Sequence, residues 1–229
     1  MKRVLTIFFV ILICIAGVYA QGNGDPVIVD DSGTPAAASS SGSGGGMETF
    51  FGLKVNLGFA NIREISDTYG DSYSYDPLFT GGFGLRFAGY KGVIGFIAEL
   101  EWVRMGAKER IFGNTFTDKL KLDYVYLNAM FSVKFSAFYM GFGFSVGYLL
   151  KAQAVREYDS GTTLSDDVKD SFKSADVAFI TSIGALFNVS RIKLFVGLDF
   201  RISLMKINEY ASSYSKRNYS VLLNLGLGI

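Results

Sequence analysis

The sequence predicts an all-β fold: an eight-stranded antiparallel up-and-down transmembrane β-barrel with short periplasmic turns and long external loops. Three observations lead to this prediction. Apolar residues alternate with glycine or polar residues along most of the chain, which is the period of a β-strand. The stretches between these segments are long and short in turn. Although 49% of the 229 residues are hydrophobic, no internal run reaches the about 18 apolar residues that a membrane-spanning helix needs.

The alternation is clearest in a hairpin at residues 124–150, whose two arms meet at a tight turn, 136–137. One face of each arm is large and apolar, as at Leu127 and Phe142. The other face carries glycines and polar residues such as Asn128, which suit a tight polar interior. An apolar exterior around a small or polar interior is typical of a barrel that crosses a membrane.

The same pattern predicts eight strands. They are expected at 51–60, 79–87, 94–102, 124–135, 138–150, 176–187, 192–202 and 219–229. Short turns are expected at 88–92, 136–137 and 188–191, and loops at 62–77, 105–121, 151–173 and 205–218. An even number of strands leaves both termini of the chain on the periplasmic side. The three prolines fall outside these strands, as expected for a residue that cannot donate to a sheet.

Aromatic residues near the strand ends predict two girdles at the membrane interfaces. They are Trp102, Tyr148 and Tyr219 toward the external side, and Phe51, Phe87, Phe135 and Phe138 toward the periplasm. The alternative is that a phenylalanine-rich barrel places aromatic residues everywhere.

The chain before the barrel divides into two parts. Residues 1–20 read as a cleaved signal peptide, because Lys2 and Arg3 precede an apolar run and small residues lead up to Ala20. A lipoprotein interpretation of Cys14 is disfavoured, because Ile13 rather than a small residue precedes it. Residues 21–46 form a Gly/Ser-rich linker, either an inert spacer or a periplasmic tether that contacts a partner. The barrel is expected at 47–229, exported to the cell outer membrane.

Nine charged residues fall on the inward faces of the predicted strands, five basic and four acidic. They are Lys54, Arg86, Glu99, Glu101, Lys134, Asp176, Lys193, Asp199 and Arg201. Each Lys or Arg facing lipid would cost about 2–4 kcal/mol at the membrane midplane, whereas inside the barrel these groups can pair. We interpret them as a structural polar network, and a narrow ion path is the alternative.

An enzyme is disfavoured, because the chain has no histidine and its only cysteine lies in the signal peptide. The usual general base and the usual zinc ligands are therefore missing. Asp166, Asp167 and Asp170 lack the glycine and ligand spacing of a calcium loop. No catalytic, metal or cofactor-binding residue is assigned, no cofactor and no small-molecule substrate is inferred, and a net charge of +1 indicates no nucleic-acid partner.

The external loops are the remaining place for a specific interaction. Their tyrosines lie among Ser, Gly and charged residues, a mixture that makes adaptable binding surfaces. The candidate contact residues are Tyr69, Tyr73, Tyr75, Tyr210 and Tyr214. Plain solvated loops are the alternative.

Several stretches of the chain, in order and spacing, resemble the PorT-like outer-membrane β-barrel proteins of Gram-negative bacteria. They lie at 52–61, 98–108, 122–127, 143–152 and 172–176, and the resemblance covers about 50–229. It implies an eight-stranded barrel in the outer membrane with no family catalytic residue, and some relatives serve secretion or gliding machinery.

These observations together predict a non-enzymatic integral outer-membrane β-barrel, an interaction or structural component of the cell envelope. Its partners would be outer-membrane lipid and an envelope or secretion protein. The alternatives are an accessory subunit of a secretion machine, a narrow channel, and a soluble lipid-binding barrel of the lipocalin type.

Overall fold

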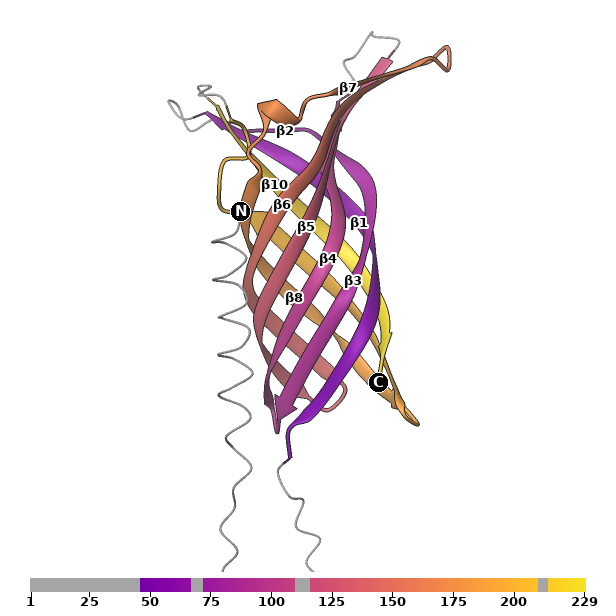
Figure 1. Cartoon of the computed structure of the whole chain (residues 1–229), viewed down its shortest axis with the longest axis vertical. Helices are drawn as coiled ribbons and strands as arrows, with labels where there is room; N and C mark the ends of the chain where they lie inside the picture. The colour runs from indigo at the N-terminus through magenta and orange to yellow at the C-terminus, as the bar shows by residue number, and fades with distance from the viewer. Residues whose placement is uncertain (1–45, 67–71, 110–115, 210–213) are drawn as a thin grey trace, which may run out of the picture. The chain divides into compact units, whose positions relative to one another are not determined.

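The computed structural model describes residues 46–66, 72–109, 116–209 and 214–229. Within them, ten strands form one antiparallel sheet, and eight long strands make a barrel wall (Figure 1). The wall strands are β1 (Glu48–Ser66), β3 (Asp76–Lys91), β4 (Ile94–Glu109), β5 (Phe116–Phe135), β6 (Phe138–Tyr158), β8 (Ala175–Val189), β9 (Ile192–Ser203) and β10 (Tyr214–Gly228). The signal peptide predicted at 1–20 and the linker up to residue 45 lie outside the described residues.

Two short strands and one helical turn complete the described chain. β2 (Ser72–Ser74) pairs with β1, and β7 (Thr163–Asp167) pairs with β6. The 3₁₀ turn η1 (Lys169–Ser171) follows β7. No helix among the residues that the structure describes is long and apolar enough to cross a membrane.

The wall closes where β1 pairs with β10, from Gly52 opposite Gly228 to Ser66 opposite Tyr214. Backbone hydrogen bonds between Phe51 and Ile229, at 3.0 and 2.9 Å, continue this seam beyond the last strand residue. Because every wall strand is hydrogen-bonded on both sides, the wall has no free edge. The predicted eight-stranded antiparallel barrel is thereby confirmed.

The two ends of the barrel differ in their connections. We call one the turn end, because β3–β4, β5–β6 and β8–β9 join there through two residues each, at 92–93, 136–137 and 190–191. Gly92, Ser136 and Ser190 adopt positive φ angles in these turns, as tight hairpins require. We call the other the loop end, where the four long connections lie. The predicted alternation of short and long connections is confirmed.

The strands reach further toward the loop end than predicted. Residues 105–109, 116–121 and 151–158 are strand and not loop, and β3 includes residues 76–77. At the turn end, residues 88–91 and 188–189 also belong to strands rather than turns. The alternation continues through the polar stretches, because Met105 and Ala107 still point inward and are buried. Pro77 fits because the register of β3 against β4 shifts between Pro77 and Gly82, the kind of irregularity that tolerates proline.

The outer wall is apolar and exposed. Leu53, Phe83 and Phe144 are 57%, 61% and 58% exposed, and the aromatic residues predicted near the turn end, such as Phe138 at 69%, are exposed as well. A soluble protein rarely exposes apolar surface that continues around its whole circumference. Lipid is the solvent that such a wall suits.

The lumen is filled by side chains in three layers. Along β4 the inward residues run from Ile97 through Glu99 and Glu101 to Val103 and Met105. The turn-end layer is Phe50, Ala88, Tyr90, Ile97, Met130, Tyr139, Ile180, Leu186 and Phe195. The loop-end layer is Ala60, Ile62, Val103, Met105, Ala107, Leu122, Tyr124, Tyr126, Leu149, Ala152, Ile207 and Leu222. Charged side chains lie between these two layers.

The expectation of a small or polar interior is therefore incomplete: large apolar side chains also fill the two outer layers, beside inward glycines such as Gly147 and buried polar residues such as Asn218. An eight-stranded barrel is narrow enough for side chains to fill. Apolar side chains fill it without needing hydrogen-bond partners, so they can close the lumen above and below the charges.

Candidate functional site

Six of the nine predicted inward charges meet in the middle layer. They come from four wall strands: Lys54 from β1, Arg86 from β3, Glu99 and Glu101 from β4, and Asp199 and Arg201 from β9. All six are at most 2% exposed. Three cations face three carboxylates, so the cluster is neutral as a whole.

Lys54 is the centre of this cluster. Its ammonium nitrogen lies 2.8 Å from Glu99 Oε2, 2.9 Å from Glu101 Oε2 and 3.1 Å from Asp199 Oδ2. An ammonium group has three hydrogens to donate, and here each has a carboxylate within reach. The lysine therefore ties β1 to β4 and β9 across the lumen.

The two arginines extend the cluster toward opposite apolar layers. Arg86 donates from Nε to Glu99 Oε1 at 2.6 Å and from Nη1 to the Tyr139 hydroxyl at 2.7 Å, and its guanidinium lies 4.3 Å from the Phe195 ring centroid. Arg201 pairs with Glu101 and lies 4.2 Å from the Tyr126 ring centroid. Aromatic faces thus cover both guanidinium groups.

Two asparagines complete the carboxylate contacts. Asn128 Nδ2 donates to Glu99 Oε2 at 2.8 Å and to Glu101 Oε1 at 2.9 Å, and Asn56 Nδ2 donates to Glu101 Oε2 at 2.8 Å. Asn128 was placed on the inward face from the sequence, but neither it nor Asn56 was counted with the charges. Each asparagine lies an even number of residues from an inward charged residue on its own strand, Asn56 from Lys54 and Asn128 from Lys134. This spacing was the signal that could have added them to the polar network.

The carboxylates of Glu99, Glu101 and Asp199 have oxygens within 4.8 Å of one another, a grouping that could hold a cation. The Lys54 ammonium already lies among them and supplies that positive charge. The arrangement therefore fits an internal ion-pair network better than a metal centre.

The other three predicted charges lie apart from this cluster. Asp176 accepts hydrogen bonds from the hydroxyls of Tyr126, at 2.7 Å, and Ser203, and both of these donors are neutral. Lys134 and Lys193 both pair with Glu48 near the turn end. Glu48 was missed by the sequence analysis, because it precedes the first predicted strand.

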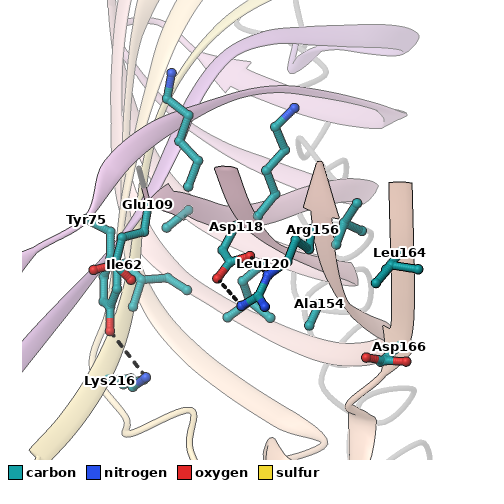
Figure 2. A pocket seen from close by; sticks show the side chains of 14 residues that line it. Ile62, Tyr75, Glu109, Asp118, Leu120, Ala154, Arg156, Leu164, Asp166 and Lys216 are labelled. Carbon is teal, nitrogen blue, oxygen red and sulfur yellow. Dashed lines mark hydrogen bonds and ion pairs between the residues drawn. The ribbon is translucent and has the colours of Figure 1, made fainter. Parts of the chain in front are cut away.

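The loop end carries a cavity of about 390 Å³ (Figure 2). Ile62, Leu120, Ala154 and Leu164 give it apolar lining, and the continuations of β4, β5 and β6 together with β7 form one side of it. Figure 1 shows β6 and β7 extending as a hairpin at this end, and β5 accompanies β6 to its last residue, with Phe116 opposite Tyr158.

Two polar contacts border the cavity (Figure 2). Arg156 donates to both carboxylate oxygens of Asp118, at 2.7 and 2.8 Å. This hydrogen bonding lowers the pKa of Asp118 below its usual value. Tyr75 donates to Glu64 Oε2 at 2.7 Å and accepts a hydrogen bond of 3.4 Å from Lys216.

Tyr75 is thus the one predicted loop tyrosine that the structure places at this cavity. Tyr69 and Tyr210 lie outside the described residues. Tyr73 lies in β2 and Tyr214 at the start of β10. The prediction that these tyrosines contact a partner stays a prediction.

No protein-family model matches the chain, and no curated protein matches it. The resemblance to PorT-like proteins therefore also stays a prediction. Solved structures with similar strand arrangements exist at low sequence identity.

One is Ail, the attachment invasion locus protein of Yersinia pestis, solved in complex with the heparin analogue sucrose octasulfate. It is 13% identical over 78% of this chain and 99% of its own, with a TM-score of 0.41. Neisserial surface protein A is 11% identical over 79% and 97%, with a TM-score of 0.41. The outer membrane protease OmpT from Escherichia coli is 10% identical over 78% and 96%, with a TM-score of 0.32.

Proposed function

We propose that this chain is a non-enzymatic, non-conducting β-barrel of the bacterial outer membrane. Its wall anchors the loop-end extension of β5, β6 and β7 for contacts with other envelope components. One observation carries the proposal: an apolar wall surrounds a lumen that two apolar layers close. The wall suits lipid, and the filled lumen leaves the loop end as the part of the barrel free for contacts.

The pattern of exposure supports lipid as the surrounding medium. Outward residues of opposite walls, such as Leu53 on β1, Phe142 on β6 and Leu198 on β9, are 57%, 47% and 43% exposed. A lipocalin-type soluble barrel would show the reverse, polar outside and apolar inside. The same lipid contact would make outer-membrane lipid a constant partner.

The filled lumen supports an anchor rather than a channel. Ions following the axis would have to pass the loop-end layer, in which Met105, Leu122 and Tyr124 show no exposed surface. They would then meet the paired charges around Lys54 and the turn-end layer beyond. An apolar constriction without water is a barrier to ions.

The resemblance to PorT-like proteins supports one refinement. Within the proposed role, the chain would serve as an accessory subunit of an envelope or secretion machine, reached through the loop end or through the linker at 21–46. Crosslinking from single cysteines placed at Ser160 and at Ser41 on intact cells, followed by mass spectrometry, separates these two routes.

Single-cysteine labelling tests the membrane placement, because the only cysteine, Cys14, lies in the predicted signal peptide. Spin labels at Leu127, Phe142 and Leu198 should report acyl chains. In separate variants without a spin label, Ser160→Cys should react with a membrane-impermeant maleimide on whole cells. Ser136→Cys, in a turn on the periplasmic side, should not react. Water at the three wall positions would overturn the proposal.

Planar-bilayer recording tests the absence of conduction. The purified barrel should show no single-channel steps. The double substitution Met105→Gly and Leu122→Gly, which removes side chains from the loop-end layer alone, should also show no steps, because the charged cluster and the turn-end layer still close the lumen. Regular steps from the unchanged protein would establish the channel alternative instead.

A further inference from the structure

The outer wall changes from apolar to polar on the loop-end side of the apolar band, and among the residues that the structure describes it becomes strongly basic on β4, β5 and β6. In the register of these strands, Trp102 lies opposite Val125, and Val125 opposite Tyr148. This row ends the apolar part of the wall. The next outward row toward the loop end joins Arg104, Asp123 and Lys151.

The following rows continue the positive charge. Lys121 lies opposite Gly106 and Gln153, and Lys108 lies opposite Lys119. These side chains point outward, because Met105, Ala107 and Leu122, which alternate with them, are buried in the lumen. We call this group the basic wall patch: Arg104, Lys108, Lys119, Lys121 and Lys151. Its carboxylates are Asp123 and Glu157, and two more lie beside it, Asp76 opposite Lys108 and Asp167 opposite Gln153.

Two of the five cations are already paired. Arg104 holds Asp123 through two contacts, of 2.7 and 3.2 Å, and Lys119 pairs with Glu157. Lys108, Lys121 and Lys151 have no ion pair among the described residues. These three lysines, on the neighbouring strands β4, β5 and β6, therefore keep ammonium groups that a ligand can contact, while Asp76 and Asp167 beside the patch reduce its net positive charge.

The described strands elsewhere in the wall do not carry a comparable cluster of lysines and arginines. On β8 and β9 the outward residues stay apolar to the loop end, as at Ile202 and Leu204, which are 58% and 46% exposed. The seam between β1 and β10 carries only the facing pair Arg63 and Arg217 in the comparable position. The described part of the barrel thus has one sector suited to a multiply charged anion.

We infer that the basic wall patch is a binding site for the phosphorylated headgroup of a glycolipid in the outer leaflet. This inference rests on the proposed membrane placement. Lipid phosphates lie at the height where the apolar wall ends, and lysine and arginine clusters at that height bind anionic headgroups. The acyl chains of the same lipid would lie against Trp102, Tyr148 and Leu150 directly below.

The position of Arg104 fits this role. Its guanidinium lies 5.6 Å from the Trp102 ring centroid, between the aromatic row and the lysines. Asp123 holds the guanidinium from one side, which fixes its direction and leaves other N–H groups to donate to a phosphate. The lysines, on flexible stems, can follow phosphates at different spacings.

Lipid binding to the purified full chain in detergent micelles tests the inference, with native mass spectrometry as the readout. The probes are bisphosphorylated lipid A, its dephosphorylated form and inorganic phosphate. The wild type should bind the bisphosphorylated lipid and neither of the others. Since one basic residue near a membrane surface contributes about fivefold, the triple variant K108Q/K121Q/K151Q should bind roughly 100-fold more weakly.

The control variant K169Q/K173Q/K206Q removes the same charge from the loop-end connections between β7 and β10 and should bind like the wild type. Equal binding by both variants, or equal binding of the dephosphorylated lipid, would overturn the inference. Binding of inorganic phosphate as strong as that of the lipid would do so too, because the site would then not require the lipid.

Membrane fractionation of cells and heat-dependent gel migration, both carried out on the same variants, distinguish a failure of this inference from a failure of the proposed function. If the wild type is found in the outer membrane but the triple variant binds lipid normally, only the present inference fails. If the wild type is recovered in the soluble periplasmic fraction, the membrane placement fails, and the inference fails with it.

Discussion

Lys54 and Glu101 meet across the lumen, with Lys54 Nζ 2.9 Å from Glu101 Oε2, although their strands are not neighbours in the wall. β3 lies between β1 and β4 in the sheet. The contact therefore adds a link that the backbone hydrogen bonds do not provide. Because both side chains have no exposed surface, neither has water as an alternative partner.

Replacing Lys54 by methionine should destabilise the barrel strongly. Glu99, Glu101 and Asp199 would keep their charges and lose the ammonium between them, and breaking a buried ion pair costs about 3–5 kcal/mol. Urea unfolding in micelles, followed by tryptophan fluorescence and gel migration, measures the loss. Lys91→Met, an exposed lysine at the turn end, is the control and should change little. Equal stability of the two variants would show that the central lysine is not part of a buried network.

Replacing Glu99 by leucine should lower the stability in detergent by a similar amount, because Arg86 and Lys54 both lose an acceptor. Adding Arg86→Met should cost less than the sum of the single changes, since the second substitution removes a charge that the first left unpaired. A double-mutant cycle in the same urea assay gives the coupling. Strict additivity would contradict a direct interaction between Arg86 and Glu99.

Two glycines of β6 offer a matched test of lumen packing. A Cβ at Gly147 would lie 2.4 Å from the Tyr126 ring, whereas a Cβ at Gly141 would have its nearest neighbour at 3.5 Å. Gly147→Ala should therefore cost about 1–3 kcal/mol by forcing the ring aside, and Gly141→Ala should be nearly neutral. The Tyr126 ring also holds Asp176 through its hydroxyl. A stable Gly147→Ala barrel with an unchanged melting temperature would mean that this ring has room to move.

Acid should loosen the extension at the loop end. The hydrogen bonds from Arg156 lower the pKa of Asp118 in the folded state. Their contribution is therefore present above the unfolded pKa of about 3.9 and is lost as the pH falls through the lower folded value. Hydrogen exchange at 116–121 and 152–158, corrected for the intrinsic rate, should accelerate between about pH 5 and about pH 3. The effect should be modest, because the pair is 45% and 40% exposed.

Asp118→Asn should show this loss already at about pH 5, where the wild-type carboxyl is ionised. Glu209→Gln, an exposed carboxyl in the connection between β9 and β10, serves as the control. Unchanged exchange in Asp118→Asn would contradict the stabilising role of the pair.

Much of the candidate site can be predicted from the alternation of inward and outward residues along each strand, which we call strand parity. A residue two positions from an inward residue also points inward, so the inward direction of Lys54, Glu99 and Asp199 follows once the strands are placed. Parity does not say which strands face each other across the lumen. It could not separate Asp176, whose partners are hydroxyls, from the central cluster, nor join Lys134 and Lys193 to Glu48.

The eight strands, the alternating connections and the apolar outer face could be predicted from the sequence alone, because they follow from a period of two along single strands and from the lengths of the stretches between them. The three-dimensional structure adds that two layers of mainly apolar side chains close the lumen, that Lys54 rather than an arginine is the centre of the charged cluster, and that the strands continue past the apolar band. These features depend on the stagger of neighbouring strands, which sets the height of each residue along the axis. That stagger arises from the closure of the whole sheet, and no single strand encodes it.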